Sequence, residues 1–207
     1  MHDGSDLPPG SFGERELHCT DLPNKPFYRA YRSKYPQPLG FKPSPSRFSD
    51  PRIGEPSYDP YGTLYIGESF EVCVLETIIR DSGIGLEGKA IPISEDDLSQ
   101  WSIAELKASE PMRFLDLTGG GAVALQIPTD AIRAKDHSLG QAWSEAIHNH
   151  PDAPDGLIFS SRLNEQRNAA VFSRAIGPLA VIGTQRIIDM QDELAELLEK
   201  YKIALVP

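Results

Sequence analysis

Seven prolines fall between residues 36 and 60 of this 207-residue chain, and they set the first limit on its fold. A proline has no backbone N–H to donate and its ring fixes φ, so it is excluded from helix interiors and from the middle of a sheet. The segment 36–60 is therefore predicted to be a long loop. A loop of this length inside one compact domain is more often functional than idle.

Regular elements are expected on both sides of this loop. Short alternating or apolar runs predict strands at 27–32, 63–66, 89–93, 113–116, 156–160 and 179–183. Helical spacing of apolar residues predicts helices at 95–101, 140–148 and 190–201, and one that begins after Ser69 as N-cap and ends at Arg80. Residues 1–24 lack periodicity and are expected to form an irregular N-terminal arm. Residues 25–207 would then form a single α/β (α+β) domain.

Charge is unevenly distributed along the chain. The formal net charge is −10, but residues 25–52 contain seven cations and the single acid Asp50, a local charge of +6. The rest of the chain therefore carries −16. An acidic protein with one basic segment suits a small anion better than a polynucleotide, so no nucleic-acid partner is expected. Aromatic residues interleave the cations and could stack a base; a solvated basic loop is the alternative.

Other classes of protein fit the composition less well. No apolar run approaches the length of a membrane span, and the polar first twenty residues contain no apolar signal-peptide core, which predicts a cytoplasmic protein. Two cysteines do not make a disulfide framework. His148, His150 and Asp152 have spacings that a metal could use, but they fall at a predicted helix end, where capping explains them. No metal is expected.

Glu76 lies on a largely apolar face of the predicted helix 69–80, together with Val72, Cys73 and Ile79. A carboxylate in this position is costly to bury unless it is used. One interpretation is an i,i+4 ion pair with Arg80. The other is catalytic, because a fixed carboxylate stabilises the cation that forms on a sugar when a glycosidic bond breaks.

Several short motifs together resemble the RES-domain family, the NAD-consuming toxins of bacterial toxin-antitoxin systems. The similarity runs over about residues 26–200. It rests on the following residues: Tyr28-Arg29, Arg47, Leu64-Tyr65-Ile66, Glu68-Ser69, Leu75-Glu76 and the run from Asp155 to Arg162 that contains Ser160-Ser161.

The resemblance implies a fold and a set of roles. The fold would be ADP-ribosyltransferase-like, with a central mixed β-sheet flanked by helices. Arg29, Glu76 and Tyr65 would be catalytic, and Arg29, Arg47, Tyr65 and Ser161 would bind NAD as the substrate. Strand alternation sends only one of two neighbouring serines into a pocket, and the match to Ser-Arg selects Ser161 over Ser160. A cognate antitoxin that covers the active site is the expected protein partner, and a homo-oligomer is plausible.

Three functions remain open from the sequence. The first is an enzyme that degrades NAD by hydrolysis or phosphorolysis of the nicotinamide–ribose bond. The second is an ADP-ribosyltransferase that passes the same ribosyl group to a protein. The third is a non-catalytic module that binds a nucleotide or RNA. Both enzymes require Glu76, whereas the binding module does not.

Overall fold

The computed structural model describes residues 6–80, 82 and 89–207. Eight strands form the main sheet: β1 (Cys19–Asp21), β2 (Phe27–Arg32), β3 (Thr63–Gly67), β5 (Trp101–Ala108), β6 (Arg113–Asp116), β7 (Gly156–Ser160), β8 (Arg167–Phe172) and β9 (Leu179–Arg186). Their spatial order is β1-β6-β7-β8-β3-β2-β5-β9. The pairs are antiparallel except β6 with β7, so the sheet is mixed.

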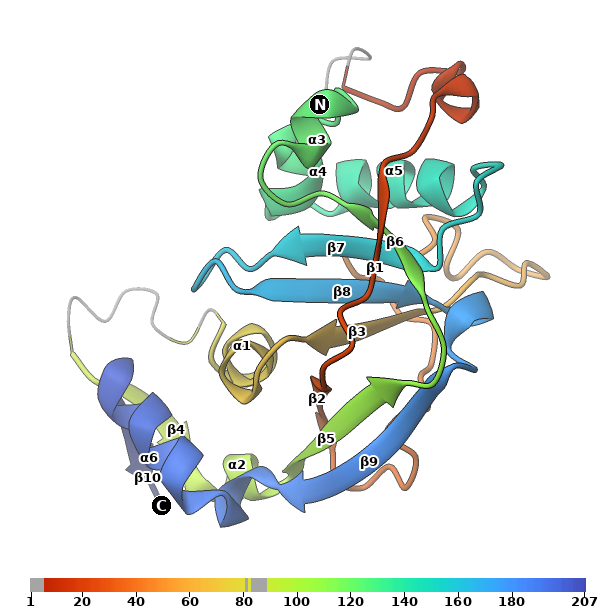
Figure 1. The fold of residues 1–207 in the computed structure, drawn as a ribbon. Coiled ribbons are helices and arrows are strands. Elements are labelled where there is room, and N and C mark those ends of the chain that lie inside the picture. Colours follow the sequence, from red (N-terminus) through yellow and green to blue (C-terminus); the bar gives the residue numbers. More distant parts are fainter. Residues whose placement is uncertain (1–5, 81, 83–88) are drawn as a thin grey trace.

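Helices and a second, smaller sheet surround the main sheet. The α-helices are α1 (Phe70–Val74), α2 (Glu95–Ser99), α3 (Gly121–Ala124), α4 (Thr129–Arg133), α5 (Ser138–His148) and α6 (Gln191–Lys200). Strands β4 (Ile91–Ser94) and β10 (Ile203–Val206) pair in parallel. Figure 1 shows α3, α4 and α5 beside β6 and β7, and α6, β4 and β10 at the other end of the molecule. The predicted α/β domain with a central mixed sheet flanked by helices is confirmed.

Apolar side chains from these helices bury the sheet. On one side, Leu139 and Trp143 of α5 pack in a cluster with Leu157 of β7 and Phe172 of β8. A separate cluster joins α1 to α6 and β5. Because α1 is held in this second cluster, its position relative to the sheet is fixed, and with it the position of the residues that follow α1.

The segment before residue 25 is less irregular than predicted. A short 3-10 turn (Phe12–Glu14) precedes β1, which pairs with β6. Phe12, Leu17 and Leu22 are all at most 7% exposed. Their spacing of five residues matches neither helix nor strand periodicity, which is why the pattern predicted an irregular arm. Residues 1–5 lie outside the described residues.

Most predicted elements are found, but four strands were not predicted: β1, β5, β8 and β10. β2, β6 and β7 have the predicted bounds, while β3 and β9 extend further and β4 starts two residues later. The helix predicted at 95–101 ends at Ser99, and β5 begins at Trp101. β8 and β10 were missed entirely. β8 is buried on both faces, so it shows no alternation of polar and apolar residues.

The predicted helix 69–80 has an unexpected second half. Ser69 is the N-cap, as predicted, and its side chain accepts a hydrogen bond from Val72 N at 3.1 Å. After α1 the chain continues as a π-helical turn (Leu75–Ile79), closed by a bond from Arg80 N to Leu75 O at 2.7 Å. π turns are rare and concentrate at functional sites. Glu76 lies in this turn.

Candidate active site

A pocket opens where β2 and β3 separate. These strands share one register pair, Tyr28 with Gly67, after which β2 stays paired with β5 and leaves β3. The pocket between them has a volume of about 970 Å³ and is lined by β2, the loop 33–62, β3, and the helix α1 with its π turn. This volume is at the upper end of the range of about 300–1,000 Å³ that is usual for small-molecule sites. The loop predicted from its prolines therefore forms one wall.

The charges on the pocket wall are predominantly positive. Among the described lining residues, one carboxylate, Glu76, faces five cationic side chains: Arg29, Arg32, Lys42, Arg47 and Arg80. Arg32 is also paired with Asp97 at 2.9 Å. In a protein of net charge −10, this convergence creates a local site for an anion.

Glu76 is held by a residue from the far end of the sequence. Ser161 Oγ donates a hydrogen bond to Glu76 Oε1 at 2.6 Å, and Leu163 N donates to the same Oγ at 3.0 Å. Ser161 is completely buried, whereas Ser160 is half-buried. Ser161 thus lies behind Glu76 and orients its carboxylate. Short O–H···O⁻ bonds of this kind are about twice as strong as neutral ones.

Arg47 forms another wall of the pocket. Its Nη1 donates to Ala134 O at 2.6 Å, and the side chain is 9% exposed. Burial lowers the pKa of Arg47, and the positive charges of Arg162 and Arg80 lower it further. The lowered pKa means that the guanidinium lacks full compensation, so an anion bound beside it would be stabilising.

The Arg47 segment is fastened to α5. Gln141 Nε2 donates to Ser46 O at 3.0 Å, and Gly140 lies against the Arg47 backbone. A Cβ at position 140 would be 2.7 Å from Arg47 O, so a glycine is required for this approach. The loop is therefore anchored at Arg47 even though it contains no helix or strand.

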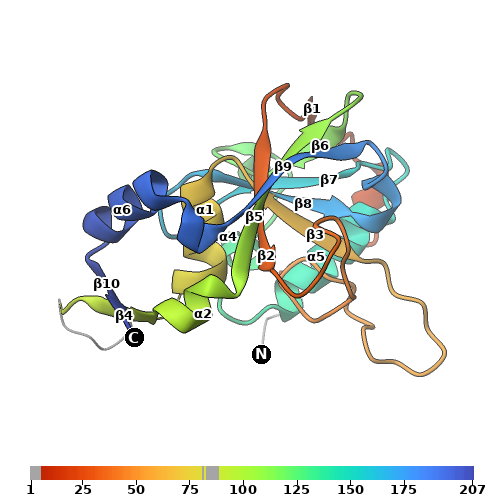
Figure 2. The same ribbon diagram turned by 90° about the horizontal axis from the view of Figure 1, so that it is seen from below.

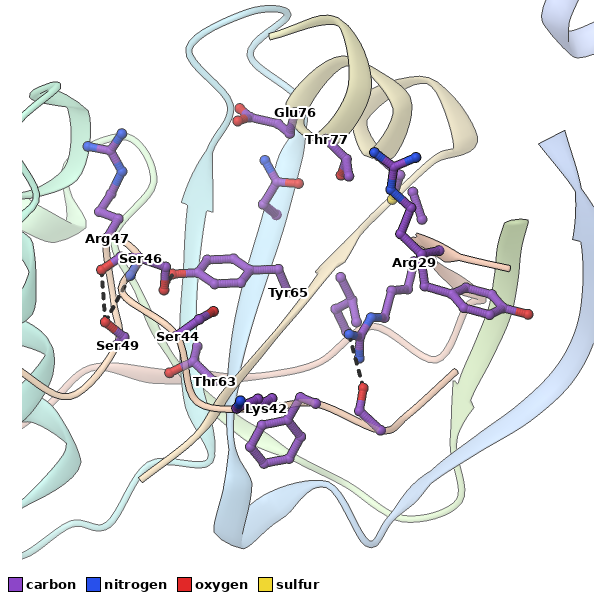
Figure 3. Close-up of a pocket in the computed structure, with 18 of the residues that line it drawn as sticks. Arg29, Lys42, Ser44, Ser46, Arg47, Ser49, Thr63, Tyr65, Glu76 and Thr77 are labelled. Carbon is purple, nitrogen blue, oxygen red and sulfur yellow. Dashed lines mark hydrogen bonds between the residues drawn. The ribbon is translucent and has the colours of Figure 1, made fainter. Parts of the chain in front are cut away.

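Tyr65 has its ring in the pocket and its hydroxyl in the loop (Figure 3). The hydroxyl accepts a hydrogen bond from Phe48 N at 2.9 Å and shares another with Ser46 Oγ at 3.0 Å. Burial raises the pKa of Tyr65, which favours the neutral phenol. The side chain thus ties β3 to the loop and presents an aromatic surface to a ligand.

Arg29 lies across the Tyr65 ring from Arg47, as Figure 3 shows. Its Nη2 donates to Gly40 O at 3.2 Å, whereas its Nη1 is buried without a hydrogen-bond partner among the described residues. Burial lowers the pKa of Arg29 to about 10. A buried guanidinium nitrogen without a hydrogen-bond partner lowers the stability of the free protein, and a bound anion would supply the missing partner.

The structure brings Arg29, Arg47, Tyr65 and Glu76 to one pocket and places Ser161 directly behind it. The polar lining residues that sequence reasoning did not assign to the site include Thr77, Arg80, His137 and Asn168. Arg80 was considered only as an ion-pair partner, and Asn168 lies on β8, which was not predicted. His137 precedes α5 and carried no signal of its own.

No group of three or more His, Cys, Asp or Glu side chains within the described ranges is arranged to hold a metal ion. None of the helices in residues 6–80, 82 and 89–207 has the length and apolar character needed to cross a bilayer.

Comparison with known families decides the affiliation of the chain. Residues 26–191 match the family model described as the RES domain. The chain belongs to the RES-domain family. Every residue that lines the pocket, and Ser161 behind it, falls within the matched range. The resemblance inferred from the separate motifs is thereby confirmed.

Two known proteins are similar to this RES-domain chain. "Probable toxin y4kH" from Sinorhizobium fredii is 37% identical over 128 residues, which cover 62% of this chain and 100% of that protein. The crystal structure of the M. tuberculosis MbcT-MbcA toxin-antitoxin complex contains a chain that superposes with a TM-score of 0.56 at 17% identity, over 83% of this chain and 89% of that one. At this identity the second likeness establishes the fold.

Proposed function

We propose that this RES-domain protein is a toxin that binds NAD in the pocket and cleaves its nicotinamide–ribose bond. The observation that carries the proposal is the arrangement of one carboxylate, oriented by a buried serine, in a pocket whose other charged side chains are cations. NAD has a negatively charged diphosphate, which the cations could bind, and a glycosidic bond to a cationic ring, at which the carboxylate could act. The name of the S. fredii relative and the toxin-antitoxin complex of the structural neighbour support the toxin assignment.

The residues have separate tasks in this mechanism. The guanidinium groups of Arg29 and Arg47 bind diphosphate oxygens, which a planar fork matches two at a time. As the C1′–N bond breaks, its electron pair goes to the pyridine nitrogen, nicotinamide leaves neutral, and positive charge develops on the ribose. The Glu76 carboxylate stabilises that charge. An oxygen nucleophile then bonds to C1′ and releases a proton.

Replacement of Glu76 by glutamine tests this mechanism. Glutamine keeps the size and can still accept from Ser161, so the change removes the charge and little else. One carboxylate at about 4 Å from a developing cation contributes about 4 kcal/mol at an effective dielectric of 20, which is about a thousandfold in rate. Glu196→Gln, an exposed position on α6, is the matched control. Wild-type consumption of NAD by Glu76→Gln would refute the assignment.

Analysis of products separates the alternatives. NAD incubated with the purified protein is analysed by mass spectrometry with and without inorganic phosphate. ADP-ribose indicates hydrolysis, a phosphorylated ADP-ribose indicates phosphorolysis, and a mass increase on an added protein indicates ADP-ribosyl transfer. Unchanged NAD in every sample would leave the non-catalytic nucleotide- or RNA-binding module as the function.

The toxin assignment has its own test in cells. Expression in a bacterium is expected to arrest growth and to lower cellular NAD, and Glu76→Gln should do neither. We also propose that a cognate antitoxin binds over the pocket, which predicts that a protein that restores growth also blocks NAD consumption by the purified enzyme. Growth arrest with NAD levels intact would favour transfer to a protein target instead.

A further inference from the structure

Asn168 is a buried polar residue in the pocket that none of the roles above uses. It lines the pocket and is 7% exposed. Its Nδ2 is buried and has no hydrogen-bond partner among the described residues. Buried polar groups are nearly always paired in folded proteins, so an unpaired amide donor in a pocket indicates that its partner comes from outside the chain.

The strand register places Asn168 close to the proposed reaction centre. On β8 it is the partner of Gly67 in β3, and Ala170, two residues further, is the partner of Tyr65. Residues two apart share a face of a strand, so Asn168 and Tyr65 lie on the same face of the sheet. Because Gly67 has no side chain, the carboxamide has room beside β3.

The helix that carries Glu76 forms the other side of this niche. A Cβ at position 67 would lie 3.2 Å from Asn168 Oδ1 and 2.8 Å from Cys73 Sγ. The Asn168 carboxamide and Cys73 therefore both border the space beside Gly67, and Cys73 lies one helical turn before Glu76. A ligand group bound to the Asn168 carboxamide would thus lie beside the helix that carries Glu76, in the same pocket.

A carboxamide offers one donor and one acceptor side by side, and its best complement is a second carboxamide. In NAD that group is on the nicotinamide ring, two ring positions from the nitrogen whose bond to ribose is proposed to break. We propose that Asn168 binds the nicotinamide carboxamide and determines which pyridine nucleotides are cleaved. This inference rests on the proposed function.

Substrate analogues test the inference. The 3-acetylpyridine analogue of NAD keeps the carbonyl group but lacks the amide N–H₂, and the nicotinic acid analogue has a carboxylate in its place. Asn168→Ala removes both hydrogen bonds of the proposed carboxamide pair, so kcat/KM for NAD should fall by about tenfold or more, whereas kcat/KM for the 3-acetylpyridine analogue should fall less because only the bond to its carbonyl is lost. The preference for NAD, expressed as a ratio of kcat/KM values, should thus fall in the variant. Asn24→Ala, an exposed position outside the pocket, should leave the ratio unchanged.

Stability provides a second readout. Removal of an unpaired buried amide should leave the Tm of the free protein unchanged or raise it, whereas a structural asparagine would lower it. Asn168→Asp keeps the shape without the donor and gives the same comparison if the alanine variant does not fold. If wild-type protein consumes NAD and the preference survives both substitutions, the inference is wrong and the proposed function stands. If wild-type protein consumes neither NAD nor its analogues, the proposed function itself fails.

Discussion

Gly140 connects a helix far from the reaction centre to the anion-binding wall, and its replacement by alanine gives a quantitative prediction. In an exposed helix, Gly→Ala stabilises by about 1 kcal/mol, because alanine loses less backbone entropy on folding. Here the new Cβ would lie 2.7 Å from both Ala131 O and Arg47 O, and 2.9 Å from Arg47 Cγ. Two of these three atoms are backbone atoms and cannot rotate away.

The clash must therefore move α5 away from the loop. Overpacking costs about 1–3 kcal/mol, and two backbone atoms closer than 3 Å favour the upper part of this range, about 2–3 kcal/mol. After the gain of about 1 kcal/mol in helix propensity, we expect a net loss of stability of about 1–2 kcal/mol. In a chain of this length that corresponds to a fall in Tm of about 2–8 °C. Because the displaced atoms belong to Arg47, KM for NAD should rise more than kcat falls.

Thermal unfolding and steady-state kinetics on one protein sample measure both effects. The control is Gly177→Ala, where no heavy atom lies within 4 Å of the added Cβ, and neither Tm nor KM should change there. An unchanged or higher Tm for Gly140→Ala would show that α5 and the loop tolerate the extra methyl group. An unchanged KM together with a lower Tm would show that Arg47 does not contact the substrate.

Three further predictions concern other residues of the site. Ser161→Ala should lower kcat by about tenfold or more with little change in KM, because the Glu76 carboxylate loses its hydrogen bond while Arg29 and Arg47 are unaffected. A rise in KM alone would contradict this prediction. Arg29→Met should abolish binding of ADP-ribose, measured by calorimetry. The Tm of the variant should stay level or rise, because a poorly compensated buried charge is removed, and a fall in Tm would indicate a structural role for Arg29. Burial and the charges of neighbouring arginines lower the pKa of His137, and a bound anion should raise that pKa. ADP-ribose should therefore bind more tightly as the pH falls from about 7 to about 5.5. His137→Gln should flatten this pH dependence, and an equal slope in the variant would exclude His137 as its cause.

Local signals in the sequence were sufficient for the parts of the site that lie on well-patterned elements. Ser69 as a helix N-cap, the strand that carries Arg29 and the strand that ends near Tyr65 all follow from short-range rules, and the structure confirms them. The π turn around Glu76 has no comparable signal. It depends on how the helix is packed in the cluster shared with α6 and β5, which is a long-range effect.

The same distinction explains what was missed. β8 is buried on both faces, so its sequence shows no alternation of polar and apolar residues that would indicate a strand. Because β8 was not predicted, Asn168 was not considered as a site residue. Ser161 could be assigned by resemblance, but its bond to Glu76 joins residues 85 positions apart. The separation of β2 from β3, which creates the pocket, is a property of the whole sheet and not of either strand.

The charge distribution explains how an acidic protein can bind an anionic ligand. Exposed acids beyond about 8 Å from a ligand are largely screened at physiological salt, while partly buried cations on the pocket wall are not. A ligand in the pocket is therefore influenced by the converging arginines and not by the net charge of −10. These cations lie on both sides of Tyr65, with Arg47 on one side and Arg29 on the other. An anionic group bound over the Tyr65 ring can therefore be approached by guanidinium groups from two sides, while the acidic exterior has little effect on it.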